Sequence, residues 1–553
     1  MKKIALGTLL LFSCYLLGAQ TLSRQKQGVG GAQTLSRPKL VVGIVVDQMR
    51  WDYLYRYYDK YGVGGFRRLL NEGFSCENTL ISHLPSYTAV GHSTIFTGSV
   101  PAIHGITGNS WMDQQTGRTW YCTEDTTVET VGSTDAEGRM SPRNLLASTV
   151  TDELRLATNF HSKVVGVSLK DRAAILPAGH AANGAFWFDD STGNFITSTY
   201  YMQELPEWVK RFNEKKEPEK LMSGPWNTLY PIGTYTESTP DEEAWEGKFP
   251  GEQTTSFPHD LPAIYKRSKE SLRPTPFGNT LILDFAMKAI EGYELGAGGA
   301  TDFLTINCAS TDYVGHQFGP NSIEIEDTYL RLDKDLAAFF TYLDQRVGKG
   351  NYLLFLTADH GAAHAIDFSK EHKIPSDFFQ SGKLVADVNQ FLERQFGVEK
   401  LVKSGMNYHL NFDGEKIRSN KLDEDVIKEA AIAFLQRRPG VQFVVDVDHI
   451  GEASVPEPIK TMIINGYNKK RCGSVMIIPE PGVFDSYATG TTHGAWNLYD
   501  IHIPLVFMGW HITHGASTQT VHMTDIAPTV AALLHIQMPN GCVGEPIEKV
   551  IGR

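Results

Sequence analysis

Residues 351–361 of this 553-residue chain are Asn-Tyr-Leu-Leu-Phe-Leu-Thr-Ala-Asp-His-Gly, an apolar run that ends in two polar side chains. The run has the length of a strand, and it leads into the carboxylate of Asp359 and the imidazole of His360. Ligands of open α/β sheets bind at the carboxyl ends of strands. An Asp-His pair there can hold a divalent cation such as zinc, which takes oxygen and nitrogen ligands. Alone, the pair is weak evidence, because so short a motif often occurs by chance.

A second run, residues 40–47, supports the same kind of sheet. It reads Leu-Val-Val-Gly-Ile-Val-Val-Asp, without the alternation of a half-buried strand, and it also ends in an acidic residue. Such runs are typical of parallel strands that helices cover on both faces. We therefore expect an α/β fold with a mostly parallel sheet sandwiched between helices. The further elements we expect in the main domain are strands at 164–169, 303–308, 476–478 and 504–508, a hairpin at 185–201, and helices at 281–293, 323–347 and after Thr524.

Two segments interrupt this pattern. Residues from about 203 to 275 are rich in Pro, Trp and charge and have poor periodicity, which predicts a surface insertion that forms a cap or lid. Residues from about 366 to 470 contain a helical pattern at 423–438, stopped by Pro439-Gly440, and a strand at 441–445. This second insertion is predicted to be a small α/β subdomain.

The N-terminus has the pattern of an export signal. Two lysines precede an apolar stretch over residues 4–17, and two small residues follow it. We interpret residues 1–19 as a cleavable signal peptide, and a lipoprotein site at Cys14 as a weaker alternative. Residues 20–37 form a polar leader that we expect to be disordered. No later stretch is long enough to span a bilayer, so we expect a periplasmic or secreted protein without stable membrane insertion.

The composition limits the partners. The net charge of −12 and the pI near 5.8 argue against non-specific nucleic-acid binding, which requires a basic face. An acidic protein that acts on an anionic substrate must supply positive charge locally, and metal ions can do so. We therefore expect no nucleic-acid partner. We also expect small-molecule substrates and a monomer, although the composition does not determine the oligomeric state.

The cysteines beyond the signal show no metal-type spacing. Cys308 lies inside an apolar strand, where a buried free thiol is expected. The simplest pairing of the others is Cys76 with Cys122 and Cys472 with Cys542, although spacing does not determine connectivity.

Polar side chains at several strand ends form one candidate site. Asp47 ends the first strand, Asp312 and His316 follow the strand at 303–308, and His493 precedes Gly494 near the last strands. In a parallel sheet these ends lie on one edge. Three Asp and three His could coordinate two cations about 4 Å apart, as in two-metal phosphoryl-transfer sites. The six candidate ligands are Asp47, Asp312, His316, Asp359, His360 and His493.

Over about residues 38–545 the sequence resembles the alkaline phosphatase superfamily, and within it the PafA-type enzymes with a threonine nucleophile. The resemblance rests on Val45-Val46-Asp47-Gln48-Met49-Arg50, Pro85-Ser86-Tyr87-Thr88, Thr97-Gly98 through His104-Gly105-Ile106 to Gly108-Asn109, Asp312-x-x-x-His316, Thr357-Ala358-Asp359-His360-Gly361, and Thr492-His493-Gly494. One departure is visible: Ala89-Val90-Gly91-His92 occurs where Gly-Pro-Gly-His is expected. It affects the turn and leaves the expected nucleophile unchanged.

The resemblance implies two Zn²⁺ ions and a role for each motif. One zinc would be held by Asp312, His316 and His493. The other would be held by Asp47, Asp359 and His360, with the nucleophile Thr88 bound to it. The residues that would hold the phosphate oxygens are Asn109, Lys170 and Arg172.

Charge and acidity agree with this assignment. A threonine hydroxyl is a poor nucleophile near neutral pH and needs an activator, which zinc can be. Two Zn²⁺, three carboxylates and one alkoxide sum to zero charge. Lys170 and Arg172 then match the dianion of a phosphate monoester.

The sequence thus predicts an exported alkaline phosphatase that hydrolyses phosphate monoesters through a phosphothreonine. The alternative is a phosphodiesterase or nucleotide pyrophosphatase of the same superfamily, which Lys170 and Arg172 disfavour because a diester carries one charge fewer. A sulfatase would need C-x-P-x-R, whereas Cys76 is followed by Glu77-Asn78. A non-catalytic metal- or phosphate-binding surface protein is the alternative from another class, and the complete set of ligands and nucleophile argues against it.

Overall fold

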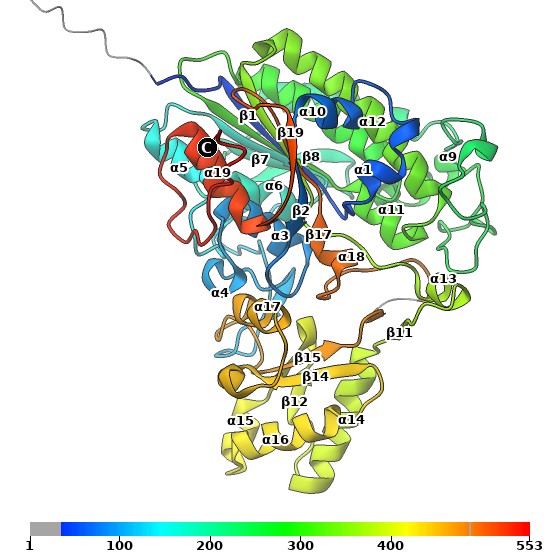
Figure 1. Ribbon diagram of the computed structural model, residues 1–553, viewed down its shortest axis with the longest axis vertical. Helices are drawn as coiled ribbons and strands as arrows, with labels where there is room; N and C mark the ends of the chain where they lie inside the picture. The colour runs from blue at the N-terminus through cyan, green and yellow to red at the C-terminus, as the bar shows by residue number, and fades with distance from the viewer. Residues whose placement is uncertain (1–34, 486–487, 553) are drawn as a thin grey trace, which may run out of the picture. The chain divides into compact units, whose positions relative to one another are not determined.

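At the centre of the computed structural model is an 11-stranded sheet whose middle strands run parallel (Figure 1). Every residue of the first and tenth strands is buried, as the unbroken apolar runs predict. The α/β fold with a mostly parallel centre is therefore confirmed. The five parallel strands are, in spatial order, β10 (Tyr352–Thr357), β1 (Leu40–Val46), β9 (Asp302–Cys308), β6 (Val164–Ser168) and β7 (Gly184–Asp189).

Antiparallel strands border this centre on both sides. On one side β18 (Leu505–Gly509) pairs with β10, and on the other β8 (Asn194–Ser198) closes the predicted hairpin with β7. The five parallel middle strands place their carboxyl ends on one edge, and the bordering strands β18 and β8 run in the opposite direction. The remaining strands of the sheet are β2 (Phe74–Leu80), β5 (Thr130–Val131), β17 (His502–Ile503) and β19 (Gly515–His522).

Helices cover the sheet in two groups (Figure 1). In one group, α10 (Phe277–Tyr293) packs on β9 and β6, and α12 (Ile323–Leu343) packs on α10 and on α11 (Ser310–Phe318). In the other, α6 (Asp171–Ala178) packs on β6 and β7 and contacts α3 (Thr88–Thr97). The helix predicted for 323–347 is confirmed to Leu343, after which a π-helical turn follows. Two further helices, α5 (Val150–Ala157) and α19 (Ile526–Leu534), contact α3.

The predicted small subdomain contains its own sheet and hydrophobic core. Its strands follow the order β12 (Val402–Ser404), β13 (His409–Phe412), β15 (Val475–Pro479) and β14 (Val441–Asp446), and its longest helices are α14 (Ser381–Phe396) and α16 (Glu424–Leu435). The prediction that 476–478 belongs to the main sheet is wrong, because β15 pairs with β13 and β14. A buried apolar run looks the same in either sheet, so its partner is not encoded locally.

The segment predicted as a cap, about 203–275, is mostly irregular with short helices, and it packs on α12. Trp226 is fully buried, and its Nε1 donates to Asp327 Oδ2 at 2.7 Å. The helices of this segment are α7 (Glu207–Glu214), α8 (Glu217–Leu221) and α9 (Leu261–Arg267).

The structure describes residues 35–485 and 488–552, so the predicted signal peptide and most of the leader lie outside it. Pro38–Arg553 form one compact unit. Among the described residues there is no helix that is both long and apolar enough to cross a membrane.

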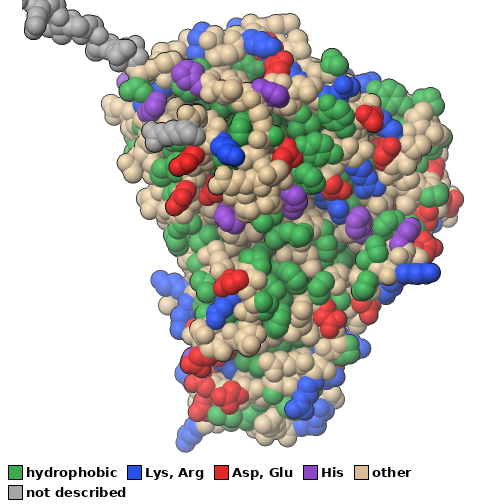
Figure 2. Space-filling model, viewed as in Figure 1, with side chains coloured by type: hydrophobic (Ala, Val, Ile, Leu, Met, Phe, Trp, Pro, Cys, Tyr) green, Lys and Arg blue, Asp and Glu red, His purple; other side chains and the backbone are tan. Residues whose placement is uncertain are grey.

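The five described cysteines are unpaired. This contradicts the predicted pairing of Cys76 with Cys122 and of Cys472 with Cys542, and it agrees with the predicted free thiol of Cys308. On the face shown in Figure 2, acidic and basic side chains are interspersed.

Candidate functional site

Four neighbouring strands of the sheet each deliver one polar side chain to the same edge. Asp359 follows β10, Asp47 follows β1, Asp312 lies in α11 after β9, and Lys170 follows β6. These four side chains are at most 3% exposed, although all of them can carry charge. Burying charges is costly unless they are paired or bind metal. The edge is therefore built to hold charged groups together.

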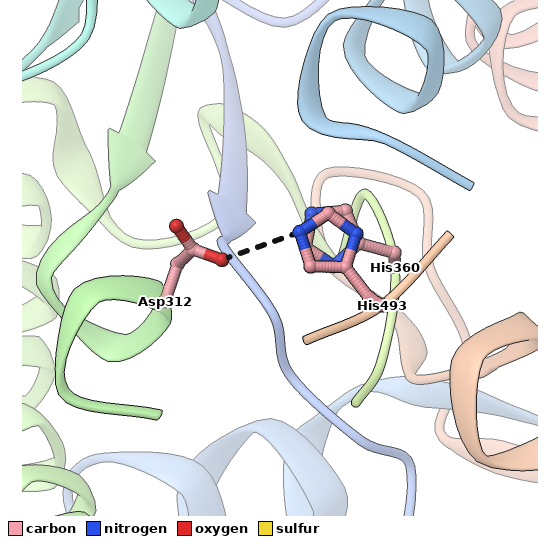
Figure 3. A group of neighbouring side chains, drawn as sticks. All are labelled: Asp312, His360 and His493. Carbon is pink, nitrogen blue, oxygen red and sulfur yellow. Dashed lines mark ion pairs between the residues drawn. The ribbon is translucent and has the colours of Figure 1, made fainter. Parts of the chain in front are cut away.

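The candidate ligands converge as two overlapping groups. Ligand atoms of Asp47, Asp359 and His360 lie within 4.8 Å of one another, and so do those of Asp312, His360 and His493. Figure 3 shows the second group, in which the rings of His360 and His493 stack with centroids 3.4 Å apart. His316 adjoins it, with Nε2 at 3.1 Å from Asp312 Oδ1. All six predicted ligands are thus brought together, and His360 lies between the two sets.

Each of the three histidines is oriented by a backbone carbonyl. The Nδ1 atoms of His316, His360 and His493 lie 2.8, 3.0 and 2.7 Å from the carbonyl oxygens of Thr491, Gly361 and Ser86. Donation from Nδ1 leaves Nε2 free to bind a metal, the usual arrangement of histidine ligands. Burial lowers the pKa of His360 and His493, which favours the neutral imidazole that metals require.

The carboxylates carry unbalanced negative charge. Burial and then the neighbouring Asp359 raise the pKa of Asp47 well above its ordinary value. Within the described residues, Asp47 Oδ1 and Asp359 Oδ2 are buried without a hydrogen-bond partner. Burial also raises the pKa of Asp312, but His316 and Lys170 hold it well below its usual range. Unpartnered carboxylate oxygens beside oriented imidazoles fit divalent cations.

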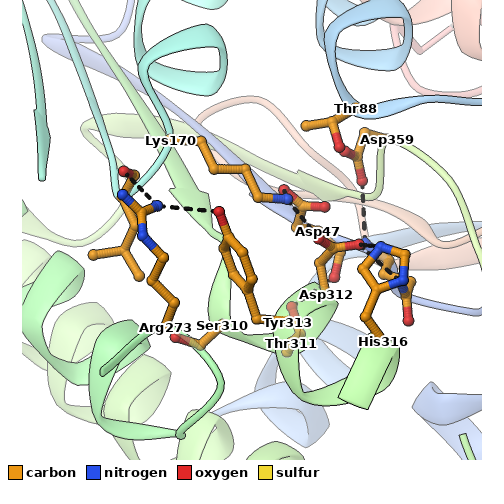
Figure 4. Close-up of polar contacts among 12 residues, drawn as sticks. Asp47, Thr88, Lys170, Arg273, Ser310, Thr311, Asp312, Tyr313, His316 and Asp359 are labelled. Carbon is orange, nitrogen blue, oxygen red and sulfur yellow. Dashed lines mark hydrogen bonds and ion pairs between the residues drawn. The ribbon is translucent and has the colours of Figure 1, made fainter. Parts of the chain in front are cut away.

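Lys170 joins the two groups of ligands. Its Nζ donates to Asp47 Oδ2 at 2.9 Å and to Asp312 Oδ2 at 2.6 Å (Figure 4). Burial lowers its pKa, but Asp312 and Asp47 raise it above the ordinary value, so the amine is protonated. The side chain predicted to bind phosphate therefore also contacts a carboxylate of each predicted set of metal ligands. The second predicted phosphate-binding cation, Arg172, donates from Nη1 to Tyr121 Oη at 3.0 Å.

The predicted nucleophile begins helix α3. Thr88 is 1% exposed, and its Oγ1 lies 3.4 Å from His360 Nε2. Asn109 is held beside it, because its Oδ1 accepts from the Ala89 backbone N–H at 3.0 Å. His92, expected to be a packing or supporting residue, places Nδ1 at 2.9 Å from Thr88 O and 3.4 Å from Asp359 Oδ2. Thr88 and Asn109 therefore both border the ligand cluster.

The unexpected Ala89-Val90-Gly91-His92 sequence keeps the one glycine that this turn requires. A Cβ at Gly91 would lie 2.3 Å from the carbonyl oxygen of Asp359. Since real Cβ atoms do not approach so closely, a side chain here would displace a predicted ligand. The departure from Gly-Pro-Gly-His leaves this contact intact.

Gln48 is a residue of the site that the sequence analysis missed. Its Nε2 donates to Asp312 Oδ1 at 2.7 Å, and its backbone N–H donates to Asp359 Oδ1 at 3.2 Å, so it contacts both sets of ligands. Its φ of 61° is uncommon for a non-glycine residue. A Cβ at Gly315 would lie 2.0 Å from Gln48 Oε1. In the sequence, only its position next to Asp47 indicates that Gln48 could belong to the site. That position does not reveal the contact with Asp312.

We expect Gln48→Leu to weaken metal binding about 10- to 100-fold, as loss of a group that supports ligands typically does. Competition with a chelator measures this change directly. Gln114→Leu is the matched control, because it removes side-chain hydrogen bonds to Met112 and Asn411 outside the site. Equal metal affinity in Gln48→Leu and the native protein would show that Gln48 does not position the ligands.

The chain is similar in sequence and fold to known phosphoesterases. Residues 41–502 match the family described as type I phosphodiesterase / nucleotide pyrophosphatase. Alkaline phosphatase PafA from Elizabethkingia meningoseptica is 56% identical over 555 residues, with 100% of this chain and 99% of the relative covered. A protein from Myroides odoratus named calcium-transporting ATPase is 55% identical over 517 residues, covering 93% and 94%. A crystal structure of wild type alkaline phosphatase PafA has a TM-score of 0.92 at 57% identity, covering 94% of this chain and 100% of that one.

Proposed function

The chain belongs to the type I phosphodiesterase / nucleotide pyrophosphatase family and is an alkaline phosphatase, and on that basis we propose that it hydrolyses phosphate monoesters through a phosphorylated Thr88. One observation carries the proposal. The Oγ1 atom of Thr88 lies 3.4 Å from Nε2 of His360, which belongs to both groups of candidate metal ligands. The nucleophile therefore adjoins the site where two cations fit.

We propose that the cations are two Zn²⁺ ions. Asp312, His316 and His493 would hold one, and Asp47, Asp359 and His360 would hold the other together with Thr88. Oxygen and imidazole donors suit zinc, and the unpartnered oxygens of Asp47 and Asp359 support a cation there. When bound, the ions supply positive charge that favours an ionised hydroxyl and stabilises the departing oxygen.

In the proposed reaction Thr88 attacks phosphorus. It is the first residue of the ten-residue helix α3, where the helix dipole favours negative charge on Oγ1. In the first step Oγ1 bonds to phosphorus, and the ester P–O bond breaks to release the alcohol. In the second step water attacks phosphorus, the bond to Oγ1 breaks, and inorganic phosphate leaves. In this proposal Asn109, whose Oδ1 accepts from the Ala89 backbone N–H, donates from its amide to a phosphate oxygen.

The two cationic side chains Lys170 and Arg172 favour a monoester over a diester. Lys170 and Arg172 together offset the two negative charges of a monoester, whereas a diester carries one, so the phosphodiesterase alternative leaves one of them uncompensated. The guanidinium of Arg172 is suited to parallel hydrogen bonds with two phosphate oxygens. The terminal phosphoryl group of ATP has the same ionisable oxygens as a monoester. ATP is therefore one of the test substrates, also because one relative is named an ATPase.

We expect the Lys170→Ala, Arg172→Ala double variant to lose roughly tenfold more kcat/KM for an aryl monoester than for its methyl diester. Loss of one charged contact in a water-poor site costs about 2–4 kcal/mol of transition-state stabilisation, and a diester uses such contacts less. The kinetics of both substrates and of ATP measure the difference. Arg143→Ala is the control, because Arg143 pairs with Asp125.

The two single variants separate substrate binding from metal binding. Because Lys170 also contacts Asp47 and Asp312, its removal alters the ligands as well, and zinc content must be measured in each variant. Arg172 contacts Tyr121 and none of the ligand carboxylates that Lys170 bridges, so Arg172→Ala reports on the phosphate alone. If kcat/KM falls equally for the monoester and the diester while the zinc content stays full, Lys170 and Arg172 do not select the substrate.

We also propose that the protein is exported to the periplasm or secreted after cleavage of a signal peptide over residues 1–19, and that it acts as a monomer. The N-terminal sequence of the mature protein and its mass in solution test these two points. Within the catalytic region, about 38–545, we propose two insertions, a cap at about 203–275 and the small subdomain from about 366.

A further inference from the structure

A pocket of about 440 Å³ lies between the catalytic region and the small subdomain. Its walls come from four segments of the chain. They are Tyr87, the start of α14 with Ser381, Gly382 and Val385, the stretch from Lys403 in β12 to Tyr408 before β13, and Asp485. The proposed mechanism uses none of these residues.

The pocket adjoins the catalytic residues on two sides. Tyr87 precedes Thr88, and its ring packs edge-on against the ring of His493 with centroids 5.6 Å apart. Asn407 donates from Nδ2 to the carbonyl oxygen of Ser110 at 2.8 Å, one residue beyond Asn109. The ring of Tyr87 therefore contacts both a candidate metal ligand and the pocket.

The turn that forms one wall is held in an unusual conformation. Asn407 and Tyr408 have φ of 56° and 63°, in the left-handed region that non-glycine residues seldom adopt. Such conformations persist only where the surroundings enforce them, and they cluster at ligand sites. A Cβ at Gly108 would lie 2.3 Å from Asn407 Nδ2, so the turn is packed tightly on the loop of Asn109. The subdomain thus fixes this wall relative to the catalytic residues.

The walls combine apolar side chains with polar and charged ones. Tyr87, Val385 and Met406 are half-buried and line the pocket, and Lys403 is exposed. A ligand group that covers the exposed parts of these three side chains is stabilised in proportion to the apolar area removed from water. Methionine also adapts its shape to different apolar groups.

We propose that this pocket is the leaving-group subsite, which binds apolar groups on the alcohol of phosphate monoesters. The inference rests on the proposed monoesterase function and adds the class of alcohol that the enzyme prefers. It gives the small subdomain a direct role in substrate choice, because α14 and the turn at Asn407 supply most of the pocket.

The test compares phosphate esters of primary alcohols, whose leaving groups have similar basicity. Alkyl phosphates with one to four methylenes are paired with the corresponding phenylalkyl phosphates, so that each pair differs mainly in the ring that reaches the pocket. For the linker of best length we expect kcat/KM to be about tenfold higher for the phenylalkyl ester in the native enzyme, the size of effect that a small apolar group has in a hydrophobic pocket. A ratio near one at every length overturns the proposal.

Two tryptophan variants place the effect in this pocket. Val385→Trp fills it, and we expect the ratio to fall to near one while turnover of the alkyl esters stays within about twofold of native. Ala430→Trp is the matched control: Ala430 is also a half-buried helical residue that packs on the core of the subdomain, but it lines a different pocket. A ratio that Val385→Trp leaves unchanged, or that both variants lower equally, overturns the proposal.

Met406→Ala keeps the test decisive if Val385→Trp does not fold. This variant removes part of one wall, and we expect it to lower the ratio severalfold without affecting the alkyl esters. Failure of the underlying function is distinguishable, because then the native enzyme hydrolyses neither ester of any pair.

Discussion

Thr88→Ala is expected to lower kcat/KM for a phosphate monoester by about 10³-fold or more, because the atom that bonds to phosphorus is removed. Thr88→Ser is expected to retain a measurable fraction, since it keeps a hydroxyl at the start of α3. Steady-state kinetics with p-nitrophenyl phosphate give both values. Mass spectrometry of the acid-quenched native enzyme should find phosphate on Thr88 and none in Thr88→Ala.

The control for this experiment lies on the same helix. Thr97 is also buried, but its Oγ1 donates to the carbonyl oxygen of Ser93 at 2.6 Å, away from the ligands. Thr97→Ala therefore makes the same chemical change without touching the site, and we expect near-native turnover from the folded variant. If Thr88→Ala hydrolyses monoesters at close to the native rate, a covalent intermediate on Thr88 is ruled out.

Removal of metal is expected to have an equally large effect. Dialysis against a chelator should abolish activity, and zinc should restore it at about two ions per chain, as a two-metal site requires. The metal-free protein should also unfold at a lower temperature, because a ligand that binds only the folded state stabilises it. Metal analysis, kinetics and a thermal melt of one preparation measure all three quantities.

Asp359→Asn separates the two metal positions. We expect it to lower the zinc content from about two ions to about one, because Asp359 belongs to one set of proposed ligands and not to the other. Asp125→Asn is the control, since Asp125 is buried but accepts from Arg143 and Ser141 outside the site. Full activity of the native enzyme with one metal ion, or with none, would contradict the two-zinc proposal.

The central parallel strands of the main sheet could be predicted from local patterns, whereas the bordering strands β2, β5, β17 and β19 were not predicted. Continuous apolar runs such as 40–46 and 352–357 are buried on both faces, and each ends in a polar residue that the structure brings to the same edge. The local pattern failed for β15, whose run Val-Met-Ile-Ile-Pro is fully buried in the small sheet rather than the large one. Burial can be inferred from an apolar run, whereas the identity of the neighbouring strand depends on the path of the whole chain.

The convergence of the six candidate ligands also followed from the sequence, because parallel strands share one carboxyl edge. The tertiary structure alone decided how these side chains meet. Gln48 contacts Asp312 across 264 residues, and Lys170 bridges Asp47 and Asp312, because β1, β9 and β6 are neighbours in the sheet. The pocket beside Thr88 likewise exists only where the subdomain packs on the catalytic region. Apolar periodicity is a property of residues close in sequence, whereas these contacts join residues that only the packed sheet and its insertion bring together.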